Sequence, residues 1–570
     1  MKKKLGLVII LLIFLCILGT IMIVQSHMVW FILEEEGAGE NFYISLTLDN
    51  MTEEKILPWY DEMEDIFYFF LPSCVTKNEL YFSNLDEHEV SVDGSVILQK
   101  TRLCWKQDQI YLVQIDGISY SVVFMKSANL PAFFIETESG NMESVNADKN
   151  YEEKGNLTVV NKDGTVQYNE RIEGISGRGN ATWEPTKKPY TIKLGRKYPL
   201  CELEKCKKWN LLALYYEQDK IHSKIIYDMG REMGLESTPE CTWVDLYCAG
   251  EYQGLYLLTE DRKNDYKDKD GYLLEKTTAD VDKQYFCLEE KKWVFEIDEP
   301  DYLSDEQMKE ISNFMYGMEN MISNNNMSYL EYLDVDSIAK QFLIDKISLN
   351  VDGMTRSSFF YLDKEENKLY AGPLWDYDLS MGQQVTDYET PIEGKPNGMF
   401  DWYMTFYETS AIYDTMVSVY IDSIPYFQDI LQEGIDEYAA WVEASVVMDS
   451  VRNPYRLPDA TKSYREWESY VKYLKYFLVN RLNYLNSLWG LEDIRFDVPE
   501  SSGEYHNIRY MTVDGIFVEE QTIMDGECIG WLPTAPDGYR GWFFLNSYKP
   551  YDNKVPIYED IILIAGYDSG

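Results

Sequence analysis

A long apolar stretch near the N-terminus constrains this chain more than any other feature. Three lysines, Lys2 to Lys4, precede an uncharged run from Leu5 to Leu33, whose core from Leu5 to Val24 is almost continuous Leu, Ile, Val and Phe. A helix of about 20 such residues spans a bilayer, and flanking lysines stay on the cytoplasmic side. We therefore predict a transmembrane signal anchor over residues 1–33. A cleaved signal peptide is the alternative, but no small-x-small cleavage site follows the run.

The anchor predicts where the remaining chain lies. It makes the protein a single-pass protein of the cell membrane, with its large domain outside the cytoplasm and the membrane itself as one partner. Lys and Arg number 52 against 97 Asp and Glu, a formal net charge of −45. This charge is typical of a soluble ectodomain, and it argues against a nucleic-acid partner, which needs clustered cations.

Histidines and cysteines exclude several classes of site. The chain has only four histidines, which are isolated from one another in the sequence: His27, His88, His222 and His506. This spacing excludes an HExxH metalloprotease site and a His-rich zinc site. No cysteine belongs to a CxxC pair, so zinc ribbons and thioredoxin-like sites have no support. Disulfides, with Cys74–Cys104 and Cys241–Cys248 as the candidate pairs, and buried free thiols both remain open.

Three regions follow the predicted anchor. Strand-like runs separated by Asp-Gly pairs predict a small β-rich accessory domain over 34–128. Residues 129–497 combine strand-like segments with amphipathic helices, one of them beginning at Asp219 and a long one ending at Gly490. Residues 498–570 follow a linker and are β-like again. The fold class is therefore α+β, with one large domain flanked by small β-rich domains.

A glycine-rich segment is the first candidate for chemistry. Gly177 and Gly179 flank Arg178 between two strand-like stretches, and Lys193 lies on the second stretch. Glycines let backbone N–H groups approach phosphate oxygens, and Arg178 adds a cation for the same oxygens. Lys193 is placed to reach a phosphate from its strand. The spacing is neither GxGxxG nor Walker A, so a glycine-rich hairpin with solvated charges is the alternative.

Three aspartates supply the other half of a phosphoryl-transfer site. Asp352 follows a predicted helix, where a carboxylate can accept the proton of an attacking hydroxyl. Asp376 and Asp378 alternate with aromatic residues, so in an extended segment both carboxylates point to one face and suit a hard cation such as Mg²⁺. Turn-forming and capping roles are the alternatives. In order along the chain, the glycine segment, the lysine and the aspartates provide the groups that phosphoryl transfer needs.

These segments resemble the CotH family, the spore-coat-protein-H-like atypical kinases. The resemblance extends over about Leu130 to Leu491 and keeps the order of the family's motifs. The segments that carry it are Gly177-Arg-Gly-Asn-Ala-Thr-Trp183, Lys187-Lys-Pro-Tyr190, Lys208-Trp-Asn-Leu-Leu-Ala213, Gly250-Glu-Tyr-Gln-Gly-Leu-Tyr-Leu-Leu-Thr-Glu260 and Gly372-Pro-Leu-Trp-Asp-Tyr-Asp378.

The resemblance implies a two-lobed protein-kinase-like fold that uses ATP and Mg²⁺ or Mn²⁺. Its activity would be phosphorylation of Ser or Thr in a surface or coat protein of a bacterium. Asp352 would be the catalytic residue, and Asp376 would bind the metal beside Asp378. Lys193 would bind phosphate together with the glycine segment, and Glu260 would lie near the nucleotide.

Two positions differ from the pattern of the family. Ser357 stands where kinase-like members often carry an Asn that holds a second metal ion, so it is the third candidate metal ligand. His222 and Ser223 stand where an Arg-Asn pair is common. A non-catalytic surface scaffold or adhesin that retains the fold is therefore an alternative to the kinase. A carbohydrate-active enzyme with two carboxylates is a weaker one, because it leaves the glycine segment and Lys193 unexplained.

The C-terminal region resembles a second family. Gly541-Trp542 and the run Val555-Pro-Ile-Tyr-Glu-Asp560 before Ala565 are similar to the β-grasp-like Listeria–Bacteroides repeat of bacterial surface proteins. The resemblance implies a spacer, or a unit that contacts the cell wall or a surface partner.

Overall fold

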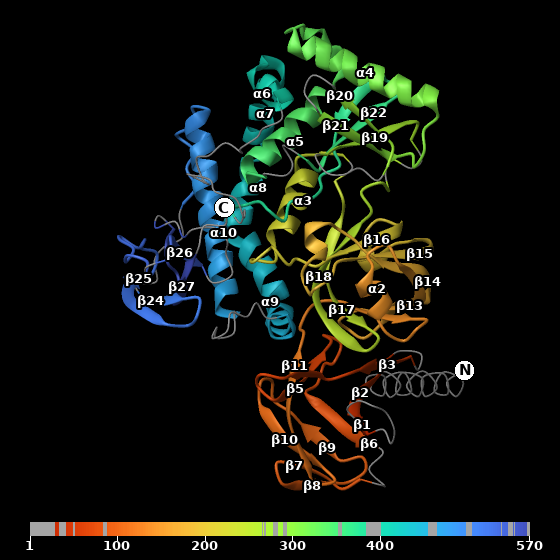
Figure 1. Cartoon of the computed structure of the whole chain (residues 1–570), viewed down its shortest axis with the longest axis vertical. Coiled ribbons are helices and arrows are strands. Elements are labelled where there is room, and N and C mark those ends of the chain that lie inside the picture. The colour runs from red at the N-terminus through yellow and green to blue at the C-terminus, as the bar shows by residue number, and fades with distance from the viewer. Residues whose placement is uncertain are drawn as a thin grey trace, which may run out of the picture. The chain divides into compact units, whose positions relative to one another are not determined.

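The structure is a computed structural model, and it describes most of the chain outside the first 28 residues. The described residues are 29–33, 42–48, 52–83, 88–236, 238–264, 266, 269–277, 283–288, 293–350, 356–382, 401–453, 464–497, 504–536, 538–544, 551, 553 and 555–566. They combine several sheets with helices (Figure 1), so the predicted α+β class is confirmed.

The described residues fall into two compact units, which are treated separately below. The first unit takes its residues from Met1–Ala213, Thr242–Leu258 and Trp441–Asn453. The second takes its residues from Leu214–Cys241, Thr259–Ala440 and Pro454–Gly570. Both units are therefore assembled from separate stretches of sequence. The predicted domain boundaries at 34–128, 129–497 and 498–570 stay a prediction.

Two sheets of the first unit come from residues 29–126. One has the strand order β3-β2-β1-β6-β9, formed by β1 (Val29–Leu33), β2 (Phe42–Thr47), β3 (Glu53–Ile56), β6 (Glu79–Ser83) and β9 (Arg102–Cys104). The other has the order β4-β5-β11-β10-β7-β8, formed by β4 (Trp59–Asp61), β5 (Ile66–Leu71), β7 (Val90–Val92), β8 (Ser95–Ile97), β10 (Ile110–Ile115) and β11 (Ile118–Lys126). Their buried faces share one core rich in aromatic side chains.

The end of the predicted membrane anchor is a strand. Val29–Leu33 pair with β2 and β6, with Val29, Phe31 and Leu33 buried and the two residues between them half-buried. Residues 1–28, which hold the rest of the anchor, lie outside the described residues. Among the helices of the described residues, none has the length together with the apolar composition that crossing a membrane requires. The predicted single-pass location in the cell membrane, with an extracytoplasmic large domain, is therefore corrected, because no helix of the described residues could serve as its spanning segment.

A closed barrel follows in the first unit (Figure 1), and it positions the glycine segment. Its strand order is β12-β13-β14-β15-β16-β18-β17. The strands are β12 (Ala132–Thr137), β13 (Glu152–Val160), β14 (Val166–Gly177), β15 (Tyr190–Tyr198), β16 (Cys206–Leu212), β17 (Cys241–Cys248) and β18 (Glu251–Glu260), with the short helix α2 (Glu143–Ala147) between β12 and β13. Closure leaves no strand edge unpaired and lets inward side chains fill the interior. Alternate residues such as Tyr190, Ile192 and Leu194 supply that core.

A buried ion pair lies in the first unit. Lys187, from the Lys-Lys-Pro-Tyr motif, lies 2.7 Å from Asp449 Oδ1 and donates a 2.6 Å hydrogen bond to the carbonyl of Leu255. Both side chains are almost wholly buried. Gly254 makes the approach possible, because a Cβ there would lie 2.1 Å from the same Asp449 oxygen. Asp449 belongs to α9 (Ile435–Arg452), so the pair joins distant parts of the sequence.

The second unit places a sheet beside helices. The sheet has the order β20-β21-β19-β22-β23, formed by β19 (Gly271–Thr277), β20 (Tyr285–Leu288), β21 (Trp293–Glu299), β22 (Ser358–Asp363) and β23 (Lys368–Ala371). The helical elements between and after these strands are α3 (His222–Glu232), α4 (Asp305–Ser323), η4 (Met327–Tyr332), α5 (Val335–Ser348), α6 (Asp401–Glu408), α7 (Ser410–Asp422), α8 (Ile424–Asp429), η5 (Ile430–Gly434) and α10 (Tyr464–Leu488). The apolar stripe predicted for the helix after Asp219, formed by Ile221, Ile225, Met229 and Met233, is buried as expected. Gly490 follows the predicted long helix with a positive φ.

The C-terminal residues of the second unit form their own sheet. Its order is β25-β24-β27-β26, from β24 (Tyr505–Thr512), β25 (Phe517–Met524), β26 (Gly541–Phe544) and β27 (Ile561–Gly566). Trp542 is buried in the core of this sheet and donates a hydrogen bond to the carbonyl of Pro533. The predicted β-rich character of this region is confirmed, whereas the resemblance to a surface repeat stays a prediction.

The cysteines of the described residues are free thiols. Cys74 is buried and Cys104 is exposed, and no disulfide joins them. Cys241 and Cys248 stand at opposite ends of β17. Since a strand rises about 3.3 Å per residue, their Cα atoms are much farther apart than the roughly 5.5 Å of a disulfide. The structure therefore favours the free-thiol alternative.

The Lys187–Asp449 pair predicts a specific loss of stability. Lys187→Met should lower the free energy of unfolding by about 3–5 kcal/mol, because it leaves a buried carboxylate without its counter-charge. Arg196→Gln removes an exposed ion pair with Glu170 and should cost less than about 1 kcal/mol. Urea unfolding of both variants measures the difference, and equal losses would contradict the assignment.

Candidate functional site

The segment Gly372–Asp378 follows β23 and carries the two predicted metal-binding carboxylates. It is not assigned as a strand, and Asp376 has a left-handed backbone with φ 66°. The expected extended conformation is therefore interrupted. Burial nevertheless alternates: Trp375 and Tyr377 are buried, whereas Asp376 and Asp378 are half-buried. The aromatic residues thus fix the segment in the core and leave both carboxylates partly accessible.

Ser357 and Asp376 come together, as the prediction of a shared metal site requires. The Ser357 hydroxyl donates a 2.8 Å hydrogen bond to Asp376 Oδ2. Ser357 precedes β22 and Asp376 follows β23, and these neighbouring antiparallel strands bring the two residues to one end of the sheet. Asp352, the predicted catalytic residue, lies outside the described residues.

Three contacts hold Tyr377, which lies between the two carboxylates. Its hydroxyl donates a 2.8 Å hydrogen bond to Asp345 of α5. Its backbone carbonyl accepts one hydrogen bond of 2.6 Å from the Ser380 hydroxyl and lies 3.1 Å from His222 Nε2. The peptide group between Tyr377 and Asp378 is therefore held by Ser380 of the same loop and by His222 of α3.

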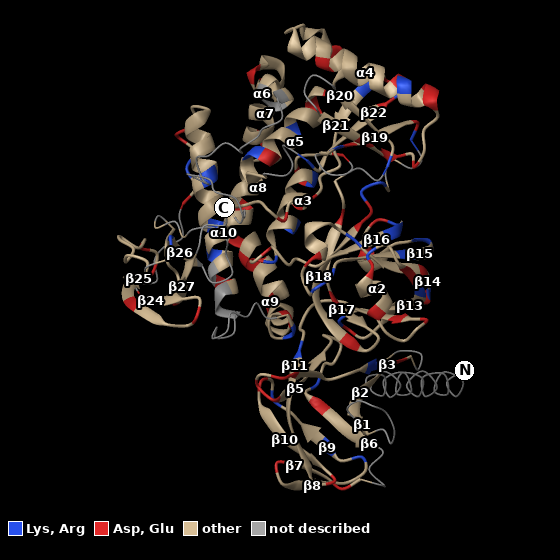
Figure 2. Cartoon of the chain, in the orientation of Figure 1, with Lys and Arg blue, Asp and Glu red and all other residues tan. Residues whose placement is uncertain are grey.

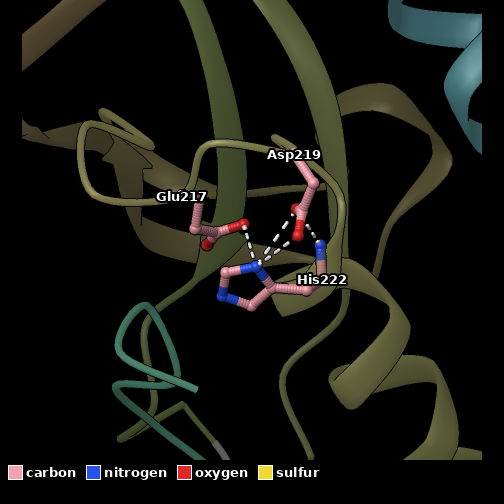
Figure 3. Close-up of side chains that lie close together, drawn as sticks. All are labelled: Glu217, Asp219 and His222. Atoms are coloured by element: carbon pink, nitrogen blue, oxygen red, sulfur yellow. Dashed lines mark hydrogen bonds and ion pairs between the residues drawn. The ribbon is translucent and has the colours of Figure 1, made fainter. Parts of the chain in front are cut away.

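Behind this segment lies a buried cluster that the sequence analysis did not identify. Glu217, Asp219 and His222 all direct their polar atoms toward one another (Figure 3). His222 Nδ1 lies 3.0 Å from Asp219 Oδ2 and 3.8 Å from Glu217 Oε2. Asp219 Oδ1 also accepts hydrogen bonds from the backbone N–H groups of Ile221 and His222. Asp219 thus fixes the start of α3 and the imidazole together.

The position of His222 determines its protonation. Nε2 faces a carbonyl oxygen, which only accepts, so Nε2 carries a proton. Burial lowers the pKa of His222, but the charges of Asp219 and Glu217 outweigh it and raise the value to about 9. Burial opposes ionisation of Asp219 too, yet the imidazolium lowers its pKa, whereas burial dominates at Glu217 and raises the pKa. The cluster is therefore an imidazolium paired with Asp219 beside a desolvated Glu217.

The two groups of residues differ in the ligand that each could bind. Asp376, Asp378 and Ser357 offer only oxygen atoms from partly accessible side chains, which fits Mg²⁺ or Mn²⁺ with water completing the shell. In the buried cluster, the charge of His222 already compensates Asp219, and the 3.0 Å distance is that of an N–H···O hydrogen bond. The Ser357–Asp376 pair, with Asp378 two residues farther along the same segment, is thus the better candidate for a metal centre.

The glycines predicted to bind phosphate lie in the first unit, and close packing explains why a glycine is needed there. A Cβ at Gly177 would lie 2.4 Å from the ring of Trp183, which belongs to the short turn η2 (Ala181–Trp183). Lys149 donates to the carbonyl of Gly179, and the Arg178 N–H donates to the carbonyl of Pro189. The segment is thus a packed loop that carries cations.

Lys193 and Glu260 have local partners. Lys193, 44% exposed on β15, lies 3.4 Å from Glu173, which Lys207 contacts at 2.8 Å. The Lys207 hydrogen bond, reinforced by Lys193, lowers the pKa of Glu173. Figure 2 shows further Lys and Arg positions, in blue, along the ribbon near β15 and β16. Glu260, in the second unit, is buried and accepts hydrogen bonds from the Glu240 N–H and the Asn264 amide. Their predicted roles toward nucleotide stay predictions.

Comparison with known families identifies one match. The CotH kinase protein family matches residues 175–485, which is more than half of the chain. A search of curated proteins found no match. The matched range includes every site residue predicted from the sequence and the buried cluster around His222.

The pKa of His222 predicts how stability changes with pH. Because the folded pKa of about 9 exceeds the ordinary value of 6.5, the stabilisation is complete below pH 6.5 and is lost as the pH rises through 9. The loss amounts to at most about 3 kcal/mol. Urea unfolding between these pH values should show this decline in the unmodified chain. His222→Gln, which cannot titrate, should show less of it, and parallel pH profiles would contradict the ion pair.

Proposed function

Because the chain belongs to the CotH kinase family, we propose that it is a CotH-like protein kinase. It transfers the γ-phosphate of ATP to a Ser or Thr hydroxyl of a surface or coat protein. One observation carries this proposal: the family match over 175–485 contains the candidate metal-binding residues, and Ser357 and Asp376 meet there at 2.8 Å. The proposed fold of the matched region is a two-lobed, protein-kinase-like fold.

The proposed metal site consists of the Ser357–Asp376 pair together with Asp378. Asp376, Asp378 and Ser357 would hold Mg²⁺ or Mn²⁺. When bound, such an ion neutralises charge on the phosphates of ATP. The left-handed backbone of Asp376 and its buried neighbours restrict the main chain here, and the Ser357 hydroxyl holds the carboxylate. This pre-organisation supports a role in binding rather than a solvated turn.

The transfer step assigns one further role. In the pattern of the family, the carboxylate of Asp352 accepts the proton of the acceptor hydroxyl. The hydroxyl oxygen then bonds to the γ-phosphorus, the bond from that phosphorus to the β–γ bridging oxygen breaks, and ADP leaves. The proposed phosphate contacts are Gly177, Arg178, Gly179 and Lys193, with Glu260 near the nucleotide.

The flanking regions have proposed roles in binding partners. The C-terminal sheet would act as a repeat-like spacer, or as a contact with the cell wall or another surface partner. A non-catalytic scaffold that retains the fold is the second candidate function. The observation that favours it is Ser357, since a hydroxyl is a poorer metal ligand than the amide oxygen common at that position.

A transfer assay separates the two functions. With labelled ATP, Mg²⁺ or Mn²⁺ and a Ser-rich acceptor protein, the full chain should transfer phosphate. Asp376→Asn and Asp352→Asn should each reduce transfer at least about 100-fold, because they remove charge that acts on the reacting groups. Asp363→Asn is the matched control, because Asp363 ends β22 and only caps a turn through the N–H groups of Glu365 and Glu366.

The contrary result is equally specific. Absence of transfer and of any thermal shift with ATP and either metal would overturn the kinase and favour the scaffold. Equal losses in Asp376→Asn and Asp363→Asn would show that the assay reports stability rather than chemistry.

A further inference from the structure

His222 is wholly buried and connects the start of α3 with the peptide between the two candidate metal ligands. Its Nδ1 faces Asp219, and its Nε2 lies 3.1 Å from the carbonyl oxygen of Tyr377. The proposed transfer chemistry gives it no role. A buried, charged group that contacts a backbone atom inside a candidate site needs an explanation beyond core packing.

We propose that His222 is a positioning residue for the metal site: it orients the Asp376–Asp378 segment by donating to the carbonyl of Tyr377. This inference rests on the proposed function for its metal, but the hydrogen bond and its effect on the segment are independent of any activity.

The geometry explains how one hydrogen bond constrains the backbone that carries the two carboxylates. A peptide group is planar, so fixing the direction of the Tyr377 carbonyl also fixes the N–H and the Cα of Asp378. On the other side, Asp376 has φ 66°, a conformation that costs a non-glycine residue about 1–3 kcal/mol and persists only where its surroundings impose it. The hydrogen bonds that the Tyr377 carbonyl accepts from His222 and Ser380, and the one that the Tyr377 hydroxyl donates to Asp345, supply that constraint.

Asp219 makes the donor rigid. Its carboxylate accepts from Nδ1 and from the backbone N–H groups of Ile221, just before α3, and of His222, its first residue. Its backbone carbonyl accepts a 2.7 Å hydrogen bond from the indole of Trp467. The imidazole therefore has a fixed orientation in a buried site. A charged donor in such surroundings forms a stronger hydrogen bond than a neutral, exposed one. Hydrogen bonds from residues outside the ligand set commonly orient the ligands of a metal.

Two substitutions of His222 distinguish the hydrogen bond made by Nδ1 from the one made by Nε2. The amide nitrogen of Gln occupies about the place of Nε2, so His222→Gln keeps a donor for the Tyr377 carbonyl and loses the one for Asp219. His222→Asn does the reverse, since its amide occupies about the place of Nδ1. Both variants remove the imidazolium and should lose similar stability. A purely structural role of His222 therefore predicts similar effects of the two changes on the segment.

Hydrogen exchange measures the segment without metal or nucleotide. In the full chain, amide exchange of peptides covering 372–382 should rise about tenfold in His222→Asn and remain closer to the unmodified rate in His222→Gln. Ser380→Ala removes the other donor to the same carbonyl and leaves the buried ion pair intact, so it should raise exchange in the same peptides even if His222→Asn fails to fold. Equal exchange in the two His222 variants, or no rise in Ser380→Ala, would overturn the inference.

Binding of Mn²⁺, followed by electron paramagnetic resonance, tests the link to the metal. The dissociation constant should rise about 10–100-fold in His222→Asn, and His222→Gln should recover most of the affinity. If the unmodified chain binds no Mn²⁺ with or without ATP, the proposed function fails, whereas the exchange contrast still decides the role of the hydrogen bond. Mn²⁺ affinity that falls equally in both variants would place the ion on the imidazole itself and overturn the positioning role.

Discussion

The ion pair between Asp219 and His222 is the interaction on which the arrangement of the candidate site depends. Removing both charges from water is costly, and only their mutual attraction and complete hydrogen bonding offset that cost. The same aspartate starts α3 and the same imidazole reaches the Tyr377 carbonyl, so one buried pair couples a helix to a loop. The buried Asp219–His222 pair thus holds the segment that carries the partly accessible carboxylates of Asp376 and Asp378.

The candidate site therefore has two layers with opposite requirements. Asp376, Asp378 and Ser357 must remain partly accessible if they are to exchange water for a cation. Glu217, Asp219 and His222 must remain dry, because solvent would weaken the attraction that orients the ring. Tyr377 connects the two layers through its carbonyl, and the burial of Trp375 and Tyr377 explains why acidic and aromatic residues alternate here.

The sequence predicts best those residues whose spacing along the chain follows from their burial. The helical stripe after Asp219 and the alternation around Asp376 are periodic, and periodicity follows from burial. The partner of His222 could not be found in this way, because it is a backbone carbonyl 155 residues away that carries no side-chain signal. The sequence does contain an indication of the ion pair, because Asp219 lies three residues before His222 at the start of a predicted helix. The prediction of a membrane anchor was wrong at the end of the apolar run, since Val29–Leu33 are equally suited to a strand.

The Lys187–Asp449 contact has a consequence for how the chain is made. The first unit is incomplete until Trp441–Asn453 is available, because that stretch supplies the partner of a buried lysine. Synthesis proceeds from the N-terminus, so the barrel strands emerge from the ribosome long before the aspartate that neutralises Lys187. Lys187 therefore stays solvated in the nascent chain, and its burial waits until the stretch that carries Asp449 has emerged.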